Sequence, residues 1–82
     1  MSAARDVVEV LARALTDQPD EVRVVESTRK GTTLVEVFVA PSEVGKVIGK
    51  QGRTVAALRT LAAAAGEKDG TTVTLEVRDG RP

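Results

Sequence analysis

The sequence predicts an α+β fold, in which helices pack on one face of a three-stranded mixed sheet. Apolar residues three and four positions apart mark three helices, and apolar residues at alternate positions mark three strands. The predicted order along the chain is α-β-β-α-α-β. At 82 residues the chain can build one hydrophobic core. We therefore expect a single domain over residues 1–82, with its core over about residues 3–78 and a frayed tail over residues 79–82.

Composition argues against most catalytic chemistry. The chain has no cysteine, histidine, tyrosine or tryptophan, and these side chains most often serve as nucleophiles, general acids and bases, or metal ligands. Its 12 acidic residues are scattered along the sequence, and scattered carboxylates are mostly solvated surface charges. We therefore expect no enzyme activity, no catalytic residue, no metal site and no cofactor.

The N-terminus and the lengths of the apolar runs give an expectation about location. Arg5 and Asp6 follow closely behind Met1, where a signal peptide would have an apolar segment. No apolar run approaches ~18 residues, the length that a membrane-spanning helix needs. We expect a cytoplasmic protein with no membrane partner.

The first helix is predicted from Ser2, a favourable N-cap residue, to about Leu15 or Thr16. Pro19 then prevents its continuation. Val10 lies off the apolar stripe, so it is either exposed or in contact with a partner. The stripe has the i, i+3/i+4, i+7 spacing of an amphipathic helix and comprises Ala4, Val7, Val8, Leu11 and Leu15.

Two strands follow and form a hairpin. The first covers about residues 22–28 and is rich in β-branched side chains, and the sequence Arg-Lys-Gly-Thr at residues 29–32 is typical of the turn. The second strand, residues 33–40, alternates in character. Leu34 and Phe38 flank a glutamate on one face, which is either covered by a partner chain or half-buried. The other face carries Val35, Val37 and Val39.

Two helices joined by a glycine loop come next. The first, residues 42–48, starts after Pro41, and the second covers about residues 53–65, with Gly66 as the residue that ends it. The last strand, residues 71–78, returns after this helical crossover. We therefore expect it to lie parallel to its neighbour in the sheet.

The loop between these helices carries the clearest functional signal. Gly49 and Gly52 bracket a lysine and a glutamine, and glycine lets another backbone come close because it has no Cβ atom. The helix N-terminus that follows favours negative charge. Although the net charge is 0, no acidic residue lies between Glu43 and Glu67. A local positive patch on a neutral protein suits a short contact with a polyanion. The cations in this window are Lys46, Lys50, Arg53 and Arg59.

Two common phosphate-binding motifs are excluded. A P-loop needs four residues between its first glycine and a Gly-Lys-Ser/Thr sequence. Here Gly45 and Gly49 have three residues between them, and Gln51 stands where the hydroxyl side chain is required. The dinucleotide fingerprint lacks its first glycine, because Val47 occupies that position. The loop therefore does not predict ATP or NAD binding.

The run Val-Ile-Gly-Lys-Gln-Gly-Arg-Thr-Val at residues 47–55 resembles the core of a KH domain, whose GxxG loop clamps about four nucleotides of single-stranded nucleic acid. The resemblance rests on a full pattern: an apolar pair before the loop, a cation within it, helices on both sides and a strand on each flank. The element order resembles the type II (bacterial) KH topology. Over about residues 3–78 the chain is similar to the small stand-alone bacterial KH proteins of the KhpA family, which implies a single KH domain.

Carried onto this sequence, the resemblance implies a set of RNA-binding residues. The glycines would let the sugar–phosphate backbone lie against the loop, and the two middle residues would contact phosphates. The bases would lie in a groove lined mainly by aliphatic side chains, which fits a chain whose only aromatic residue is Phe38. The expected residues are Gly49, Lys50, Gln51 and Gly52 in the loop, with Arg53, Lys46 and Arg59 adding charge beside it.

We therefore expect a non-catalytic RNA-binding protein of the RNA chaperone or post-transcriptional regulator type. Three or four phosphate contacts predict a log–log salt slope of about −2 to −3 and weak binding, so that useful affinity requires two linked modules. The expected partners are single-stranded RNA and a second KH domain, in a homodimer or with a Jag/KhpB-like protein. Val10 and the Leu34/Phe38 face are candidate pairing surfaces. The alternative is a protein-interaction or ribosome-assembly adaptor on a KH scaffold, in which the loop is only a turn.

Overall fold

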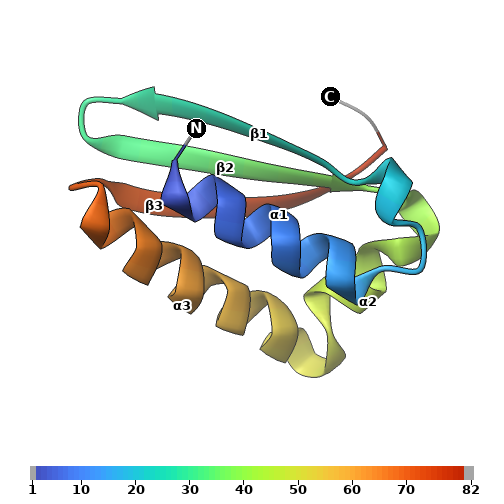
Figure 1. Cartoon of the computed structure of the whole chain (residues 1–82). Helices are drawn as coiled ribbons and strands as arrows, with labels where there is room; N and C mark the ends of the chain where they lie inside the picture. Colours follow the sequence, from blue (N-terminus) through green and yellow to red (C-terminus); the bar gives the residue numbers. More distant parts are fainter. Residues whose placement is uncertain (1, 81–82) are drawn as a thin grey trace.

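In the residues that the structure describes, 2–80, three strands form one mixed sheet and three α-helices cover one of its faces (Figure 1). The structure is a computed structural model. It confirms the predicted α+β fold, the mixed sheet and the order of the elements. The helices and strands are α1 (Ala3–Leu15), β1 (Arg23–Arg29), β2 (Thr32–Val39), α2 (Val44–Ile48), α3 (Arg53–Lys68) and β3 (Thr72–Asp79).

The central strand of the sheet is β2, which pairs with β1 in antiparallel and with β3 in parallel orientation. Lys30 and Gly31 form the turn between β1 and β2, and their φ angles are +50° and +78°. Two positive φ values are what a type I′ hairpin turn requires. The chain reaches β3 through α3, so the parallel pairing arises from the helical crossover that the sequence predicts.

The sheet extends further towards the C-terminus than predicted. Asp79 belongs to β3 and pairs with Val39, and the N–H of Gly80 donates to the carbonyl oxygen of Val39 at 2.9 Å. Residues 79 and 80, which we expected in a frayed tail, are therefore bonded to the end of β2. The register of β3 against β2 supplies a backbone partner, Val39, for these two residues, and the hydrophobic pattern of the sequence does not indicate it. The remainder of that tail, residues 81–82, lies outside the described residues.

The hydrophobic core lies between the sheet and the helices. The three valines of β2 predicted to face inwards are all 0% exposed, which confirms the assignment of that face. They belong to one cluster with Val8 and Ala12 of α1 and with Leu58 and Ala62 of α3. Fully burying a valine or leucine contributes about 1.5–3 kcal/mol relative to leaving it exposed. The small alanines let both helices lie close to the sheet.

The first helix starts where predicted and buries Ala4 and Val8 of the predicted stripe, but it buries Ala12 in place of Leu15. The Ser2 hydroxyl accepts a hydrogen bond from the N–H of Arg5 at 3.0 Å and so caps α1. The buried stripe ends on Ala12, whereas Leu15 is 37% exposed. Leu15 lines a groove between α1 and α3 together with Leu61. The prediction fails for Leu15 because α1 packs against α3 as well as against the sheet, and this groove stays uncovered.

The C-terminal end of α3 also differs from the prediction. Gly66 lies within the helix, and Gly70, with φ +71°, takes the position that ends it. The N–H of Gly70 donates to the carbonyl oxygen of Glu67 at 3.1 Å, and the N–H of Thr71 donates to that of Gly66 at 2.9 Å. These two bonds form a Schellman motif. Gly66 has a separate role, because a Cβ atom there would lie 2.4 Å from Cγ2 of Val73.

Replacing Gly66 by alanine is expected to lower the free energy of unfolding by about 1–3 kcal/mol, the cost of over-packing a tight contact. Gly45→Ala is the matched control, because Gly45 is helical and a Cβ atom there meets open space. Alanine at that position should stabilise α2 by up to about 1 kcal/mol. Chemical denaturation measures both changes, and equal stability of the two variants would contradict the packing argument.

Candidate nucleic-acid interface

The GxxG loop (Gly49, Lys50, Gln51 and Gly52) makes a sharp connection between α2 and α3. The N–H of Gly49 donates to the carbonyl oxygen of Gly45 at 2.8 Å and ends α2, and the N–H of Gly52 donates to the carbonyl oxygen of Gly49 at 3.0 Å. The φ angles of Gly49, Gln51 and Gly52 are +78°, +57° and +72°. With this backbone the side chains of Lys50 and Gln51 are exposed to solvent.

The two glycines of the loop are needed for different reasons. Gly49 combines φ +78° with ψ 169°, a region that essentially only glycine enters. A Cβ atom there would also lie 2.2 Å from Oγ1 of Thr54. Gly52 has φ +72° and ψ 13°, in the left-handed helical region, and a Cβ atom there would meet open space. Packing and backbone geometry together require Gly49, whereas backbone geometry alone favours Gly52.

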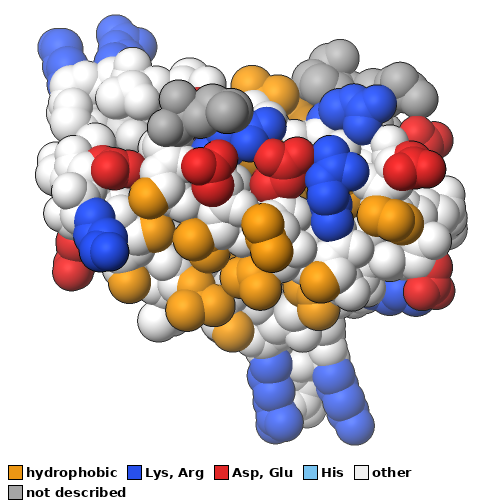
Figure 2. Space-filling view, viewed as in Figure 1, with side chains coloured by type: hydrophobic (Ala, Val, Ile, Leu, Met, Phe, Trp, Pro, Cys, Tyr) orange, Lys and Arg blue, Asp and Glu red, His pale blue; other side chains and the backbone are white. Residues whose placement is uncertain are grey.

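Two of the predicted cations lie at this loop. Lys50 is in the loop, and Arg53 is the first residue of α3. Both side chains are exposed, and Nη2 of Arg53 donates to Oε1 of Gln51 at 3.0 Å. None of the ion pairs within residues 2–80 involves either cation. Figure 2 shows basic side chains projecting from the end of the molecule where α2 meets α3.

Lys46 does not join this group. Its ammonium group pairs with the carboxylate of Asp17 and lies 3.3 Å from Oε2 of Glu43. Hydrogen bonds to Asp17 and then to Glu43 raise the pKa of Lys46 above its ordinary 10.5. The corresponding stabilisation is present below that pH and is lost as the pH rises through the higher pKa of the folded state. On a helix, residue 46 projects roughly opposite to Val44 and Ile48, so this cation faces the end of α1.

Arg59 lies on α3 beside the outer edge of the sheet. Its Nε and Nη2 atoms are each 3.4 Å from the carbonyl oxygen of Leu75 in β3. Because β3 is an edge strand, this guanidinium group reaches from the helix to the unpaired edge of the sheet. At 1.5 Å per residue it lies about 9 Å along α3 from Arg53. Arg59 therefore lies nearly two turns of α3 away from the loop, with one carbonyl partner already bound.

A shallow hollow of about 470 Å³ lies at the start of α2. Apolar side chains from α2 and the sheet meet two charged residues there. Phe38 is only 8% exposed, so its ring is packed and offers little face for stacking. Arg78 and Asp79 are lining residues that the sequence analysis missed. Their place at the end of the last strand, β3, is the signal that could have found them. The lining residues are Phe38, Pro41, Val44, Val77, Arg78 and Asp79.

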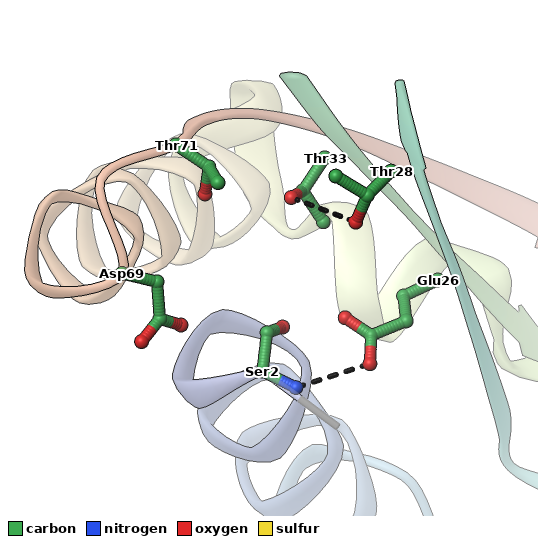
Figure 3. A pocket seen from close by; sticks show the side chains of 6 residues that line it. All are labelled: Ser2, Glu26, Thr28, Thr33, Asp69 and Thr71. Atoms are coloured by element: carbon green, nitrogen blue, oxygen red, sulfur yellow. Dashed lines mark hydrogen bonds between the residues drawn. The ribbon is translucent and has the colours of Figure 1, made fainter. Parts of the chain in front are cut away.

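The opposite end of the molecule carries a polar hollow of about 390 Å³ (Figure 3). The N–H of Ser2 donates to Oε1 of Glu26 at 3.0 Å, and that of Ala3 donates to Oδ2 of Asp69 at 3.0 Å. These bonds satisfy free N–H groups of the helix terminus and place negative charge at the positive end of its dipole. The bond with Ser2 lowers the pKa of Glu26. Both carboxylates therefore serve to hold α1.

Two further features bear on function. Within residues 2–80, no group of three or more histidine, cysteine, aspartate or glutamate side chains is placed to hold a metal ion. In the same part of the chain, no helix has both the length and the apolar character needed to cross a bilayer.

The fold is similar to two solved structures of Era. One is Era in complex with MgGDPNP and a segment of 16S ribosomal RNA, with a TM-score of 0.65, 22% sequence identity, and coverage of 93% of this chain and 29% of that chain. The other is Era of Aquifex aeolicus bound to GDP and AlF4−, with a TM-score of 0.64, 22% identity and the same coverage of 93% and 29%. At this level of identity the likeness concerns the fold alone.

Two helices joined by a GxxG loop, between parallel strands, define the class of KH-type domains. The family profile described as "KhpA/KhpB, KH domain" matches residues 5–77, and the chain belongs to this family. It is 51% identical over 77 residues to the RNA-binding protein KhpA of Aquifex aeolicus, covering 94% of this chain and 98% of the relative. The RNA-binding protein KhpA of Clostridium acetobutylicum is 44% identical over 73 residues, covering 89% and 97%. The resemblance seen in the sequence is thus confirmed.

The two loop glycines should respond differently to alanine. Gly49→Ala is expected to lower the free energy of unfolding by about 3 kcal/mol or more, because backbone strain and the clash with Thr54 act together. Gly52→Ala is expected to cost about 1–2 kcal/mol, from the left-handed backbone alone. Denaturant titrations followed by circular dichroism give both values. The geometric account fails if Gly52→Ala is as destabilising as Gly49→Ala.

Proposed function

We propose that this chain is a non-catalytic RNA-binding protein that holds the backbone of single-stranded RNA on its GxxG loop. The observation that carries the proposal is the exposure of Lys50 and Arg53, unpaired with any carboxylate of residues 2–80, on a loop whose glycines leave the backbone uncovered. The relatives named RNA-binding protein KhpA support the same function. A cytoplasmic RNA chaperone or post-transcriptional regulator fits these features.

The loop offers three kinds of contact to an RNA backbone. The ammonium group of Lys50 is a flexible point charge for a phosphate, and the N-terminus of α3 favours negative charge beside it. Gln51 accepts from Arg53 through Oε1, which leaves its amide NH2 group free to donate to a phosphate oxygen. The absence of side chains at Gly49 and Gly52 lets a sugar–phosphate chain lie directly against the backbone.

The structure reduces the number of phosphate contacts expected from the sequence. Lys46 is paired with two carboxylates, and Arg59 lies nearly two turns of α3 from the loop, where it donates to the carbonyl oxygen of Leu75. Lys50 and Arg53 remain as the cations at the loop that no carboxylate of residues 2–80 neutralises. At roughly 0.7 per contact for single strands, two contacts give a log–log salt slope of about −1.4, shallower than the slope of about −2 to −3 predicted from three or four contacts. The charge of this interface therefore favours weak, salt-sensitive binding.

Replacing Lys50 and Gln51 together by aspartate should abolish most of the affinity for a labelled single-stranded RNA and bring the salt slope close to zero. The matched control is Lys30→Asp with Thr32→Asp at the hairpin turn, which changes the net charge by the same amount at the other end of the molecule. Circular dichroism checks that both variants fold, and fluorescence anisotropy measures binding. Unchanged affinity in the folded loop variant would favour a protein-interaction or ribosome-assembly adaptor instead.

Weak binding by one loop implies a second module, and we infer that the chain pairs with another KH domain, in a homodimer or with a KhpB-like protein. Three of the four exposed large apolar side chains within residues 2–80 gather on two neighbouring helices: Val10 is 68%, Leu61 49% and Leu15 37% exposed. Figure 2 shows this apolar patch. Along α1 it is flanked by charges of both signs, including Arg5 and Glu9. Mixed charge beside an apolar patch suits a self-complementary twofold contact.

The other candidate surface is less suited to pairing. Phe38, on the open face of the sheet, is 8% exposed. On the same face, Nε of Arg78 donates to Oε2 of Glu36 at 2.7 Å, and an ion pair over a sheet must lose water before it can be covered. The faces of α1 and α3 therefore offer the better pairing surface.

A single charge in the apolar patch should separate the pair. Val10→Glu or Leu61→Glu is expected to shift a dimer towards monomer by at least about tenfold in dissociation constant, because burying an unpaired carboxylate is costly. Val25→Glu, on the open face of the sheet and 38% exposed in the native chain, should leave pairing unchanged. Sedimentation equilibrium measures all three. Dissociation by Val25→Glu alone would assign pairing to the sheet.

A further inference from the structure

Glu43 is the one carboxylate that is buried within residues 2–80, with 4% of the residue exposed. It lies in the short 3-10 turn Pro41–Glu43 that leads into α2. A buried charge needs partners that replace its water. Its surroundings therefore show what the fold uses it for.

Three groups hold the carboxylate, and they come from two separate parts of the chain. The hydroxyl of Thr16 donates to Oε1 at 2.7 Å, and the backbone N–H of Asp17 donates to the same oxygen at 2.6 Å. The ammonium group of Lys46 lies 3.3 Å from Oε2. Hydrogen bonds from Thr16 and Asp17, in that order, hold the pKa of Glu43 below its ordinary 4.5. The carboxylate thus joins the end of α1 to α2.

This link matters because α2 is short. It is five residues long, too short to be stable as an isolated helix, and no side chain caps its N-terminus. Val47 is its one fully buried apolar residue. Its other large apolar residues, Val44 and Ile48, are only partly buried against the core. Apolar contacts are non-directional, whereas hydrogen bonds to a fixed carboxylate define the position of the helix.

We propose that Glu43 is a positioning residue for the GxxG loop: it fixes α2 against the end of α1 and thereby sets where the chain enters Gly49. Glu43 does not touch RNA, and Lys46 balances its charge instead of binding a phosphate. The sequence assigns Lys46 to the RNA-binding set, whereas in the structure it pairs with Glu43. We call the contacts of Glu43 with Thr16, Asp17 and Lys46 the brace. The binding part of the inference rests on the proposed RNA function, whereas the effect on loop geometry does not.

The test uses Glu43→Met, which removes the acceptor, and Glu43→Gln, whose amide oxygen can still accept from Thr16 and Asp17. Asp17→Asn is the control, because it removes only an exposed carboxylate that also pairs with Lys46. Affinity for single-stranded RNA, its salt slope, and hydrogen exchange of the Gly49 and Gly52 amides are measured in the full chain.

We expect Glu43→Met to weaken RNA binding by roughly threefold to tenfold, a typical effect of a residue that acts from outside the contact. The salt slope should stay unchanged, because no phosphate contact is lost. The amides of Gly49 and Gly52 should exchange faster, while those of β2 keep their protection. Glu43→Gln should restore affinity to within about twofold of the native chain, because it keeps the acceptor.

The inference is overturned if Glu43→Met leaves affinity and loop exchange unchanged, or if β2 and the loop lose protection equally. A lower salt slope in Lys46→Met would also overturn it, because Lys46 would then bind a phosphate. Should Glu43→Met fail to fold, Thr16→Val decides, because it removes the hydroxyl that donates to Glu43: faster exchange at Gly49 supports the inference, and native exchange refutes it. If the native chain binds no RNA, but Glu43→Met still speeds exchange at Gly49 and Gly52 while β2 stays protected, the proposed RNA function fails and the positioning role of Glu43 is retained.

Discussion

The contact between Gly49 and Thr54 is the constraint on which the rest of the interface depends. At this point the end of α2 and the first turn of α3 approach so closely that a Cβ atom would lie 2.2 Å from a hydroxyl oxygen. The backbone can pass only with φ +78° and ψ 169°, which glycine alone adopts readily. One close approach therefore fixes the angle between the helices, the outward direction of Lys50, and the exposed backbone on which a ligand chain could lie.

The remainder of the fold holds the two helices that meet at this contact. Val47 anchors α2 in the core, and the carboxylate of Glu43 joins it to α1. At the far end of α3, Gly66 lets β3 pass closely, and the Schellman motif around Gly70 turns the chain back into the sheet. A small domain has a thin margin of stability. Positions such as Gly49 and Glu43 therefore tolerate few substitutions.

The features that the sequence predicts well are those determined within a few residues. The Ser2 cap, the Lys30–Gly31 turn and the alternating face of β2 depend on local chemistry, and the structure agrees with each. The GxxG loop belongs to this class, since two glycines and a cation are visible directly. The element order and the parallel return of the last strand follow from the same patterns.

What the sequence does not predict depends on neighbours that are distant along the chain. A positive charge is visible at Lys46 and Arg59, but their partners, Asp17 and the carbonyl of Leu75, are 29 and 16 positions away. Whether a cation is free or paired is therefore a property of the fold. The role of Gly66 could not be predicted for the same reason. It depends on a close contact with Val73 of β3, which the residues around Gly66 in the sequence do not indicate.

The central claim is that a nucleic-acid backbone occupies the GxxG loop, and an NMR titration of 15N-labelled protein with a short single-stranded RNA tests it most directly. We expect the largest amide shifts at residues 49–53, with smaller shifts at Val44 and Val77, which line the hollow at the start of α2. The hairpin turn at residues 29–31 should remain unchanged. Shifts centred on the hairpin or on the open face of the sheet, with a silent loop, would contradict the account.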